Sequence, residues 1–137
     1  YNYYRKYYKN KEGLITKTKL VEIKDLSSEE ESILEAAEYL RKGELVAFPT
    51  ETVYGLGGDG LSSEACRKIF ETKGRPADNP LILHISNIEE LSQLVKEIPD
   101  EAGKIMEHLW PGPLTLVFKA KDSVPKVVTA GGDTVAV

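Results

Sequence analysis

The stretch that decides the fold is LVAFPTETVYGLGGDG, residues 45–60. Its first four residues form a short apolar run that Pro49 stops, which is typical of a buried strand. Thr50 and Thr52 follow, and four glycines fall within the last six residues of the stretch. This pattern predicts a ligand loop, because ligands in open α/β sheets bind where strand ends meet the crevice. The alternative is a glycine-rich hairpin that needs positive φ angles, since the standard phosphate-loop motifs are absent.

Helical patterns flank this stretch on both sides. Upstream, Ser27 and Ser28 are candidate N-caps of a helix that Gly43 would end. Downstream, Ser62 is expected to cap a helix over residues 63–72. The inward-facing residues of the two helices would be Ile33, Ala36, Ala37 and Leu40, and Ala65, Ile69 and Phe70.

The rest of the chain continues the alternation of strands and helices. Strands are predicted at residues 19–24, 81–85, 114–118, 127–128 and 134–137, and helices at residues 88–98 and 100–109, with turns at 110–113 and 130–133. The order predicts an α/β fold, a twisted, mixed or largely parallel open sheet flanked by helices. The chain stops at Val137 inside an apolar run, so we expect it to be truncated at its C-terminal end.

Composition and cysteine usage are those of an ordinary globular domain. The chain has 137 residues, of which 41% are hydrophobic and 29% charged, which suits one domain. No apolar run approaches the roughly 20 residues of a membrane span, and no signal peptide is visible. The single cysteine, Cys66, excludes an internal disulfide and predicts a reducing compartment, the cytoplasm.

The charge is unevenly distributed along the chain. Residues 1–13 contain four Lys or Arg and one Glu, which gives this stretch a charge of +3. Because the net charge of the chain is −4, the remaining residues carry −7. The same opening stretch contains five of the seven tyrosines. A basic, Tyr-rich arm could stack on nucleic-acid bases, but we expect a disordered or non-native arm outside the domain. The negative charge of the residues after Gly13 argues against an extensive interface with the phosphate backbone of a nucleic acid.

The sequence Lys73-Gly74-Arg75 places two cations just past a helix end. Lysine as a mobile point charge and arginine as a planar donor could clamp a polyphosphate. Alternatively, the cations complement the helix dipole. That alternative explains Lys73 better than Arg75, which lies beyond the glycine and before a proline. Asn79 follows in the polar loop that leads to the next strand.

The remaining chemically active residues give weaker signals. His84 lies in the strand pattern LILHI, where a lone histidine is more often structural than catalytic. The other histidine, His108, is distant in sequence, so no zinc site or other metal site is expected. No motif flanks Cys66, and we do not expect it to act as a nucleophile.

Three segments together resemble the YrdC/TsaC family of threonylcarbamoyl-AMP synthases. They are L-x-x-G-x-L-V-A-F-P-T-E-T-V-Y-G-L-G (residues 40–57), I-F-E-T-K-G-R-P-A-D-N-P-L-I-L-H-I (69–85) and L-W-P-G-P-L-T-L-V (109–117). They occur in the family's order, and the resemblance covers residues 20–137. It implies a single YrdC-like domain over residues 14–137, incomplete at its C-terminal end, because the family's later S-x-N stretch and an arginine would follow Val137.

The resemblance implies an enzyme that combines L-threonine, bicarbonate or CO₂, and ATP. The carbamate of threonine would attack the α-phosphorus of ATP, giving threonylcarbamoyl-AMP and pyrophosphate. A TsaD-type complex would then transfer the threonylcarbamoyl group to tRNA, so tRNA is an indirect partner and no membrane is involved. Two alternatives remain open: a related carbamoyl-adenylate-forming enzyme, and a non-catalytic YrdC-like module that binds double-stranded RNA.

The resemblance also implies roles for individual residues. Thr52 and His84 would contact threonine, Lys73 and Arg75 would hold the ATP phosphates as the catalytic cations, and Asn79 and Thr134 would lie by the nucleotide. Adenylyl transfer concentrates negative charge on phosphate oxygens, so cations and Mg²⁺ carried by ATP would supply most of the stabilisation. A carbamate is an adequate nucleophile, so no serine or cysteine nucleophile is required.

Overall fold

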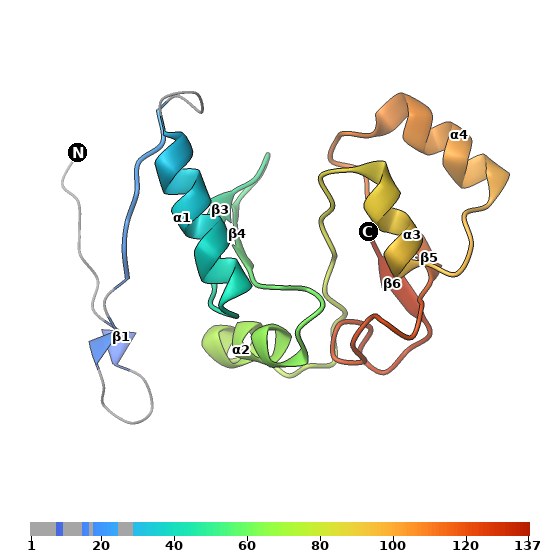
Figure 1. Cartoon of the computed structure of the whole chain (residues 1–137). Helices are drawn as coiled ribbons and strands as arrows, with labels where there is room; N and C mark the ends of the chain where they lie inside the picture. Colours follow the sequence, from blue (N-terminus) through green and yellow to red (C-terminus); the bar gives the residue numbers. More distant parts are fainter. Residues whose placement is uncertain (1–7, 10–14, 17, 25–28) are drawn as a thin grey trace. The chain divides into compact units, whose positions relative to one another are not determined.

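The structure is a computed structural model that describes residues 8–9, 15–16, 18–24 and 29–137 (Figure 1). The chain forms two compact units, residues 1–36 and 37–137, and each is described by itself. In the first unit, β1 (Tyr8–Lys9) pairs antiparallel with β2 (Ile15–Thr16).

The strand predicted over residues 19–24 is wrong. No strand forms there, and Leu20, Val21 and Ile23 are 67%, 39% and 45% exposed. The physical reason is that alternation of apolar and polar residues is a property of one segment, whereas a strand is stable only when a second strand hydrogen-bonds to it. In the described part of this unit, residues 18–24 are not paired with another strand in a ladder or bridge.

The first predicted helix is confirmed as α1 (Glu30–Arg41), which spans the boundary between the units. Its candidate N-caps, Ser27 and Ser28, lie outside the described residues. Gly43 ends it as expected: its φ is +74° and its N–H donates to the carbonyl of Leu40 at 2.9 Å. The apolar stripe of α1 is only partly covered, and none of its residues is fully buried.

The stretch that opened the sequence analysis forms a hairpin. Strand β3 (Val46–Pro49) pairs antiparallel with β4 (Tyr54–Gly57), with Val46 opposite Gly57 and Pro49 opposite Tyr54. The strand before Pro49 is confirmed, but its residues alternate between half-buried and exposed, so the expectation of a buried strand is wrong. The glycines of this stretch, as described, have no positive φ. They are needed for close approach, since a Cβ on Gly57 would lie 2.7 Å from the Phe48 ring.

Helix α2 (Ser63–Lys73) begins at the predicted residue and ends one residue later than predicted. The Ser62 hydroxyl accepts a hydrogen bond from the N–H of Ala65 at 3.3 Å, as an N-cap does. At the other end, Gly74 adopts the left-handed conformation with φ +62°. The buried face of α2 is formed by Ala65, Cys66, Ile69 and Phe70.

Extended segments of the C-terminal part form a mixed arrangement. Strand β5 (Val117–Lys119) pairs antiparallel with β6 (Thr134–Ala136). On the other side of β6, Ile82 forms a parallel bridge with Ala136. Residues 81–85 make this single bridge and no longer ladder, so they lie beside β6 without forming a full strand.

Two predicted elements differ in this part of the chain. The helix expected over residues 88–98 is a 3₁₀ turn (η1, Ile88–Glu90) followed by the short α3 (Leu91–Leu94). It ends early because Val95 forms an antiparallel bridge with Ala120. Residues 127–128 form a turn instead of the predicted strand. Val128 is fully buried in the core, so its apolar side chain reflects burial and not strand pairing.

Helix α4 (Asp100–Leu109) has the predicted bounds, and the turn over residues 130–133 and a strand near residue 134 are also confirmed. The main hydrophobic core includes Leu91, Leu94, Met106, Phe118, Val124, Val128 and Val135. The predicted α/β class is thus confirmed. Its described strands form three separate antiparallel pairs where one open sheet was expected. Among the described residues, no helix is long and apolar enough to cross a membrane.

Candidate functional site

The loop between β3 and β4 is organised by Thr50 and leaves Thr52 available. The Thr50 hydroxyl donates to the carbonyl of Val53 at 2.5 Å and accepts from the N–H groups of Thr52 and Val53 at 3.3 and 3.2 Å. Such hydroxyl-to-backbone bonds stabilise turns. The exposed side chain of Thr52 makes no hydrogen bond within residues 29–137. Of the two threonines, Thr50 therefore shapes the loop and Thr52 can meet a ligand.

His84 lies against the hairpin through the ring of Phe48. The two ring centroids are 6.0 Å apart and the planes meet at 77°, an edge-to-face arrangement. The neighbouring Leu83 fills the space over Gly60, where a Cβ would lie 2.4 Å from its side chain. The glycine-rich stretch and the LILHI segment, separate motifs in the sequence, therefore pack together.

Lys73 and Arg75 project from a Schellman turn at the end of α2. The N–H of Gly74 donates to the Glu71 carbonyl at 3.1 Å, and the N–H of Arg75 donates to the Phe70 carbonyl at 3.2 Å. Both cationic side chains are exposed, and no carboxylate in the described part of the chain pairs with either. The guanidinium carbon of Arg75 lies 5.2 Å from the centroid of the Phe70 ring. Two positive charges therefore remain free to bind an anion.

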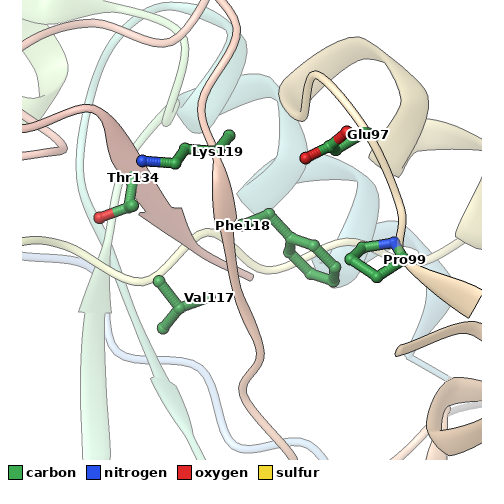
Figure 2. A pocket seen from close by; sticks show the side chains of 6 residues that line it. All are labelled: Glu97, Pro99, Val117, Phe118, Lys119 and Thr134. Carbon is green, nitrogen blue, oxygen red and sulfur yellow. The ribbon is translucent and has the colours of Figure 1, made fainter. Parts of the chain in front are cut away.

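Asn79 and Thr134 complete the residues singled out from the sequence. Asn79 is exposed in the loop after Pro76. Thr134 begins β6 opposite Lys119 and lines a cavity of about 180 Å³ (Figure 2). The other lining residues are Glu97, Pro99, Val117, Phe118 and Lys119. None of Thr52, Lys73, Arg75, Asn79 or His84 lines this cavity, so the cavity does not unite the predicted site residues.

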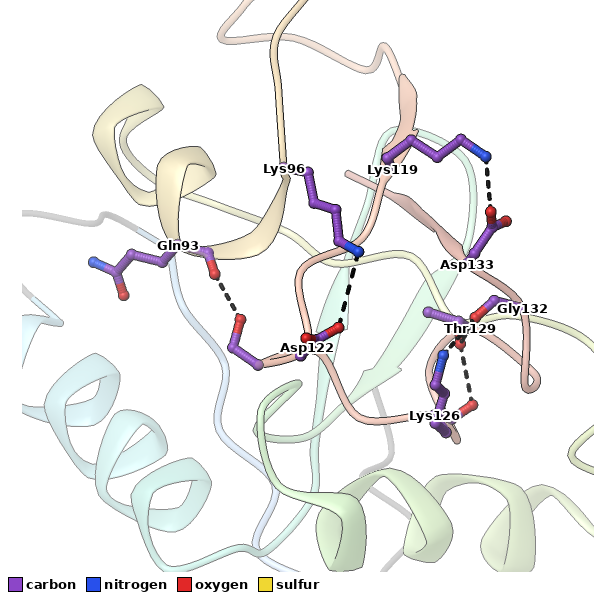
Figure 3. A network of polar contacts seen from close by, with 9 residues as sticks. Gln93, Lys96, Lys119, Asp122, Lys126, Thr129, Gly132 and Asp133 are labelled. Atoms are coloured by element: carbon purple, nitrogen blue, oxygen red, sulfur yellow. Dashed lines mark hydrogen bonds and ion pairs between the residues drawn. The ribbon is translucent and has the colours of Figure 1, made fainter.

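A second group of cations lies in and beside residues 119–133, and we call its four members the tied lysines: Lys96, Lys119, Lys121 and Lys126. Figure 3 shows three of them, Lys96, Lys119 and Lys126. Lys119 pairs with Asp133 at 2.7 Å and Lys96 with Asp122 at 3.9 Å. Lys121 and Lys126 donate to the backbone carbonyls of Ser92 and Gly132 at 2.6 and 3.1 Å. Each tied lysine already has an acceptor within the protein.

Cys66 has the surroundings of a structural thiol. It is fully buried, and its Sγ lies 3.6 and 3.7 Å from the carbonyl oxygens of Asp59 and Gly60. Burial, and then the charge of Asp59, raises the pKa of the Cys66 thiol. A raised pKa disfavours the thiolate that nucleophilic chemistry needs. Among the described residues, no three His, Cys, Asp or Glu side chains gather as a metal site would require.

The sequence reasoning missed the aromatic partners of two site residues. The sequence places Phe48 in a strand and Phe70 on an inward helix face, and in the structure each ring also contacts a candidate site side chain. A signal for Phe70 was present, because a Schellman turn commonly brings the residue after its glycine onto the last helical turn. No local pattern connects Phe48 with His84, which lies 36 positions further along.

Comparison with known proteins identifies the family. The family model Sua5_yciO_yrdC, described as "Telomere recombination", matches residues 38–137. The chain belongs to this Sua5/YciO/YrdC family, which confirms the resemblance seen in the three sequence segments.

Its relatives include named enzymes. The chain is 59% identical over 109 residues to the threonylcarbamoyl-AMP synthase of Pyrococcus abyssi, covering 80% of this chain and 32% of the relative. It is 48% identical over 124 residues to the threonylcarbamoyl-AMP synthase of Bacillus subtilis, covering 89% of this chain and 36% of the relative. The chain thus spans about a third of the length of these two relatives.

Solved structures agree with this assignment. The chain resembles the crystal structure of P. abyssi Sua5 complexed with L-threonine, with a TM-score of 0.77 and 58% identity over 79% of this chain and 32% of that one. It also resembles the solution structure of the MTH1692 protein from Methanobacterium thermoautotrophicum. There the TM-score is 0.60 and the identity 31%, over 90% of this chain and 56% of the other.

Proposed function

We propose that this protein is a threonylcarbamoyl-AMP synthase, which converts L-threonine, bicarbonate or CO₂, and ATP into threonylcarbamoyl-AMP and pyrophosphate. The observation that carries the proposal is the likeness, at 58% identity, to a Sua5 structure solved with L-threonine. The free cations after α2 and the available hydroxyl of Thr52 support it. The domain would comprise residues 14–137, with residues 1–13 outside it.

Lys73 and Arg75 would bind the phosphates of ATP. Both are exposed and lack an acidic partner in the described structure, so neither must break an ion pair to meet a ligand. Lysine supplies a mobile charge, and the guanidinium supplies a planar pair of donors that fits phosphate oxygens. As charge builds on these oxygens during adenylyl transfer, the two cations would lower the barrier.

Thr52 and His84 would contact threonine, and Asn79 and Thr134 the nucleotide. The Thr52 hydroxyl can donate to one group and accept from another. The ring of Phe48 limits the orientations open to His84. Thr134 lines a cavity that none of the other three residues lines.

In the reaction, the amine nitrogen of threonine bonds to the carbon of CO₂ and loses a proton, giving a carbamate. A carbamate oxygen then attacks the α-phosphorus of ATP, and the bond to the β-phosphate oxygen breaks as pyrophosphate leaves. Lys73, Arg75 and Asn79 are two cations and an amide, a donor set suited to phosphate oxygens and not to a metal ion. We therefore propose that Mg²⁺ arrives with the ATP phosphates.

The product, a mixed carbamic–phosphoric anhydride, would be passed to a TsaD-type complex that modifies tRNA. The cytoplasm is the compartment we propose, because both ATP and tRNA are available there.

Pyrophosphate release by the full-length protein tests the proposed function. We expect release that requires threonine, bicarbonate and ATP together. Release with carbamoyl phosphate in place of threonine and bicarbonate would instead indicate the related carbamoyl-adenylate-forming reaction. If no pyrophosphate is released, and tight, salt-sensitive binding of double-stranded RNA survives removal of residues 1–13, the RNA-binding alternative replaces the proposal.

A further inference from the structure

One residue, Phe70, holds Arg75 from two directions. The Phe70 carbonyl accepts the backbone N–H of Arg75 at 3.2 Å, and the Phe70 ring centroid lies 5.2 Å from the Arg75 guanidinium carbon. Both contacts depend on Gly74, whose φ of +62° turns the chain back over the last turn of α2. The pair is therefore a local unit that forms together with the end of the helix.

The burial of Phe70 also points to this unit. Its ring is only 4% exposed, yet Phe70 is not part of the main core cluster of the described residues. The Arg75 guanidinium therefore lies over a buried ring that is outside this core cluster. A cation over an aromatic face is attracted by the ring quadrupole.

This contact restrains Arg75 without occupying its donors. An exposed arginine samples many rotamers and loses that freedom when it binds a ligand. A guanidinium held over a ring keeps its N–H groups free for phosphate oxygens. Lys73, two residues earlier, has no such restraint in the described structure.

We propose that Phe70 is a positioning residue that orients the Arg75 guanidinium toward the phosphates of ATP. The proposal rests on the proposed function, since it assigns Arg75 the same ligand. Phe70 itself does not touch the substrate; it acts through Arg75.

The test measures Mg-ATP affinity in the full-length protein. We expect Phe70→Leu and Phe70→Met, which keep the apolar volume and remove the π face, to weaken binding about two- to five-fold. Phe70→Tyr, which keeps the π face, should bind Mg-ATP as tightly as the wild type. The control is Ile69→Val, at a buried position on the same helix, and it should leave the affinity unchanged. The KM for ATP should rise in the Leu and Met variants while the KM for threonine does not.

A double-mutant cycle separates positioning from packing. In an Arg75→Ala background, Phe70→Leu should have no further effect on ATP affinity. An equal loss in both backgrounds, or a loss with Ile69→Val as large as with Phe70→Leu, would overturn the proposal.

A ligand-free measurement distinguishes this proposal from the proposed function. The Phe70 ring current should displace the NMR signal of the Arg75 Nε–H, and Phe70→Leu should remove that displacement. Failure of the wild type to bind ATP, with the displacement present, would refute the proposed function and with it the role of the pair. ATP binding without the displacement would refute the positioning role alone.

Discussion

The two groups of cations in this protein have the same chemistry and different surroundings. Lys73 and Arg75 extend from the end of α2, and neither forms an ion pair with a carboxylate in the described structure. The tied lysines, around residues 119–133, each reach a carboxylate or a backbone carbonyl. A basic residue is thus informative about function only when its internal partners are known. The first group is available to a ligand, whereas the second stabilises the protein's own loops.

The largest effect that follows concerns activity. Lys73→Ala or Arg75→Ala should reduce threonine-dependent pyrophosphate release by about tenfold or more, the loss of a charge-assisted contact of about 1.5–3 kcal/mol. The melting temperature should change little, because neither side chain has an internal ion pair to lose. Lys121→Ala, which removes a tied lysine, is the matched control and should keep the wild-type rate. Equal rates in all three variants would remove the distinction between the two groups.

The turn that presents the free cations should be sensitive to backbone geometry. Gly74→Ala places a Cβ at a φ of +62° and should cost about 1–2 kcal/mol of unfolding free energy. The control is Gly103→Ala, inside α4 with open space around it, which should stabilise the protein by about 0.5–1 kcal/mol. Denaturant titration measures both. If both variants change the unfolding free energy in the same direction, the assigned turn at Gly74 is contradicted.

The loop that holds the tied lysines should depend on Thr129. This buried hydroxyl donates to the Gly132 carbonyl at 3.0 Å, beside the bond from Lys126. Thr129→Val removes the donor at similar volume and should cost about 1 kcal/mol of unfolding free energy. Thr115→Val, at an exposed position, should be nearly neutral. If the two variants prove equally stable, the hydroxyl does not brace the loop.

The smallest effect is the pH response of the Lys119–Asp133 pair. The hydrogen bond and charge of Lys119 hold the pKa of Asp133 below its ordinary value of 3.8. Since the pKa is lowered on folding, the pair's stabilisation is present above about pH 4 and is lost as the pH falls through the lowered pKa. Lys119→Met should raise the pKa of Asp133 toward its ordinary value, as an NMR titration of the carboxyl would show. An unchanged pKa would mean that the pair is absent in solution.

The helices could be predicted from the sequence because their signals are local. Ser62, Gly74 and the apolar spacing between them define α2, and α4 has the predicted bounds. Strands are different, since each needs a partner elsewhere in the chain. Residues 19–24 alternate only in part and form no strand, whereas Val95 lies in a helical pattern and instead forms a bridge with Ala120.

The candidate site shows the same limit. Lys73 and Arg75 could be singled out because a glycine and a proline mark the end of their helix. Whether their charges were free could not be predicted, because it depends on the absence of acids brought near by the fold. The contact between Phe48 and His84 joins distant segments through space and has no local signature. The assigned roles of all six site residues stay predictions: Thr52, Lys73, Arg75, Asn79, His84 and Thr134.

The parallel bridge between Ile82 and Ala136 sets an order of events during synthesis. The hairpin of β3 and β4 joins residues close in the chain and can close within microseconds of leaving the ribosome. Ile82 instead pairs with Ala136, which is synthesised more than fifty residues later. At about 5–20 residues per second, that interval lasts roughly 3 to 11 s. For those seconds the apolar LILHI segment lacks its strand partner, so the nascent chain presents it to any chaperone that recognises extended apolar peptides.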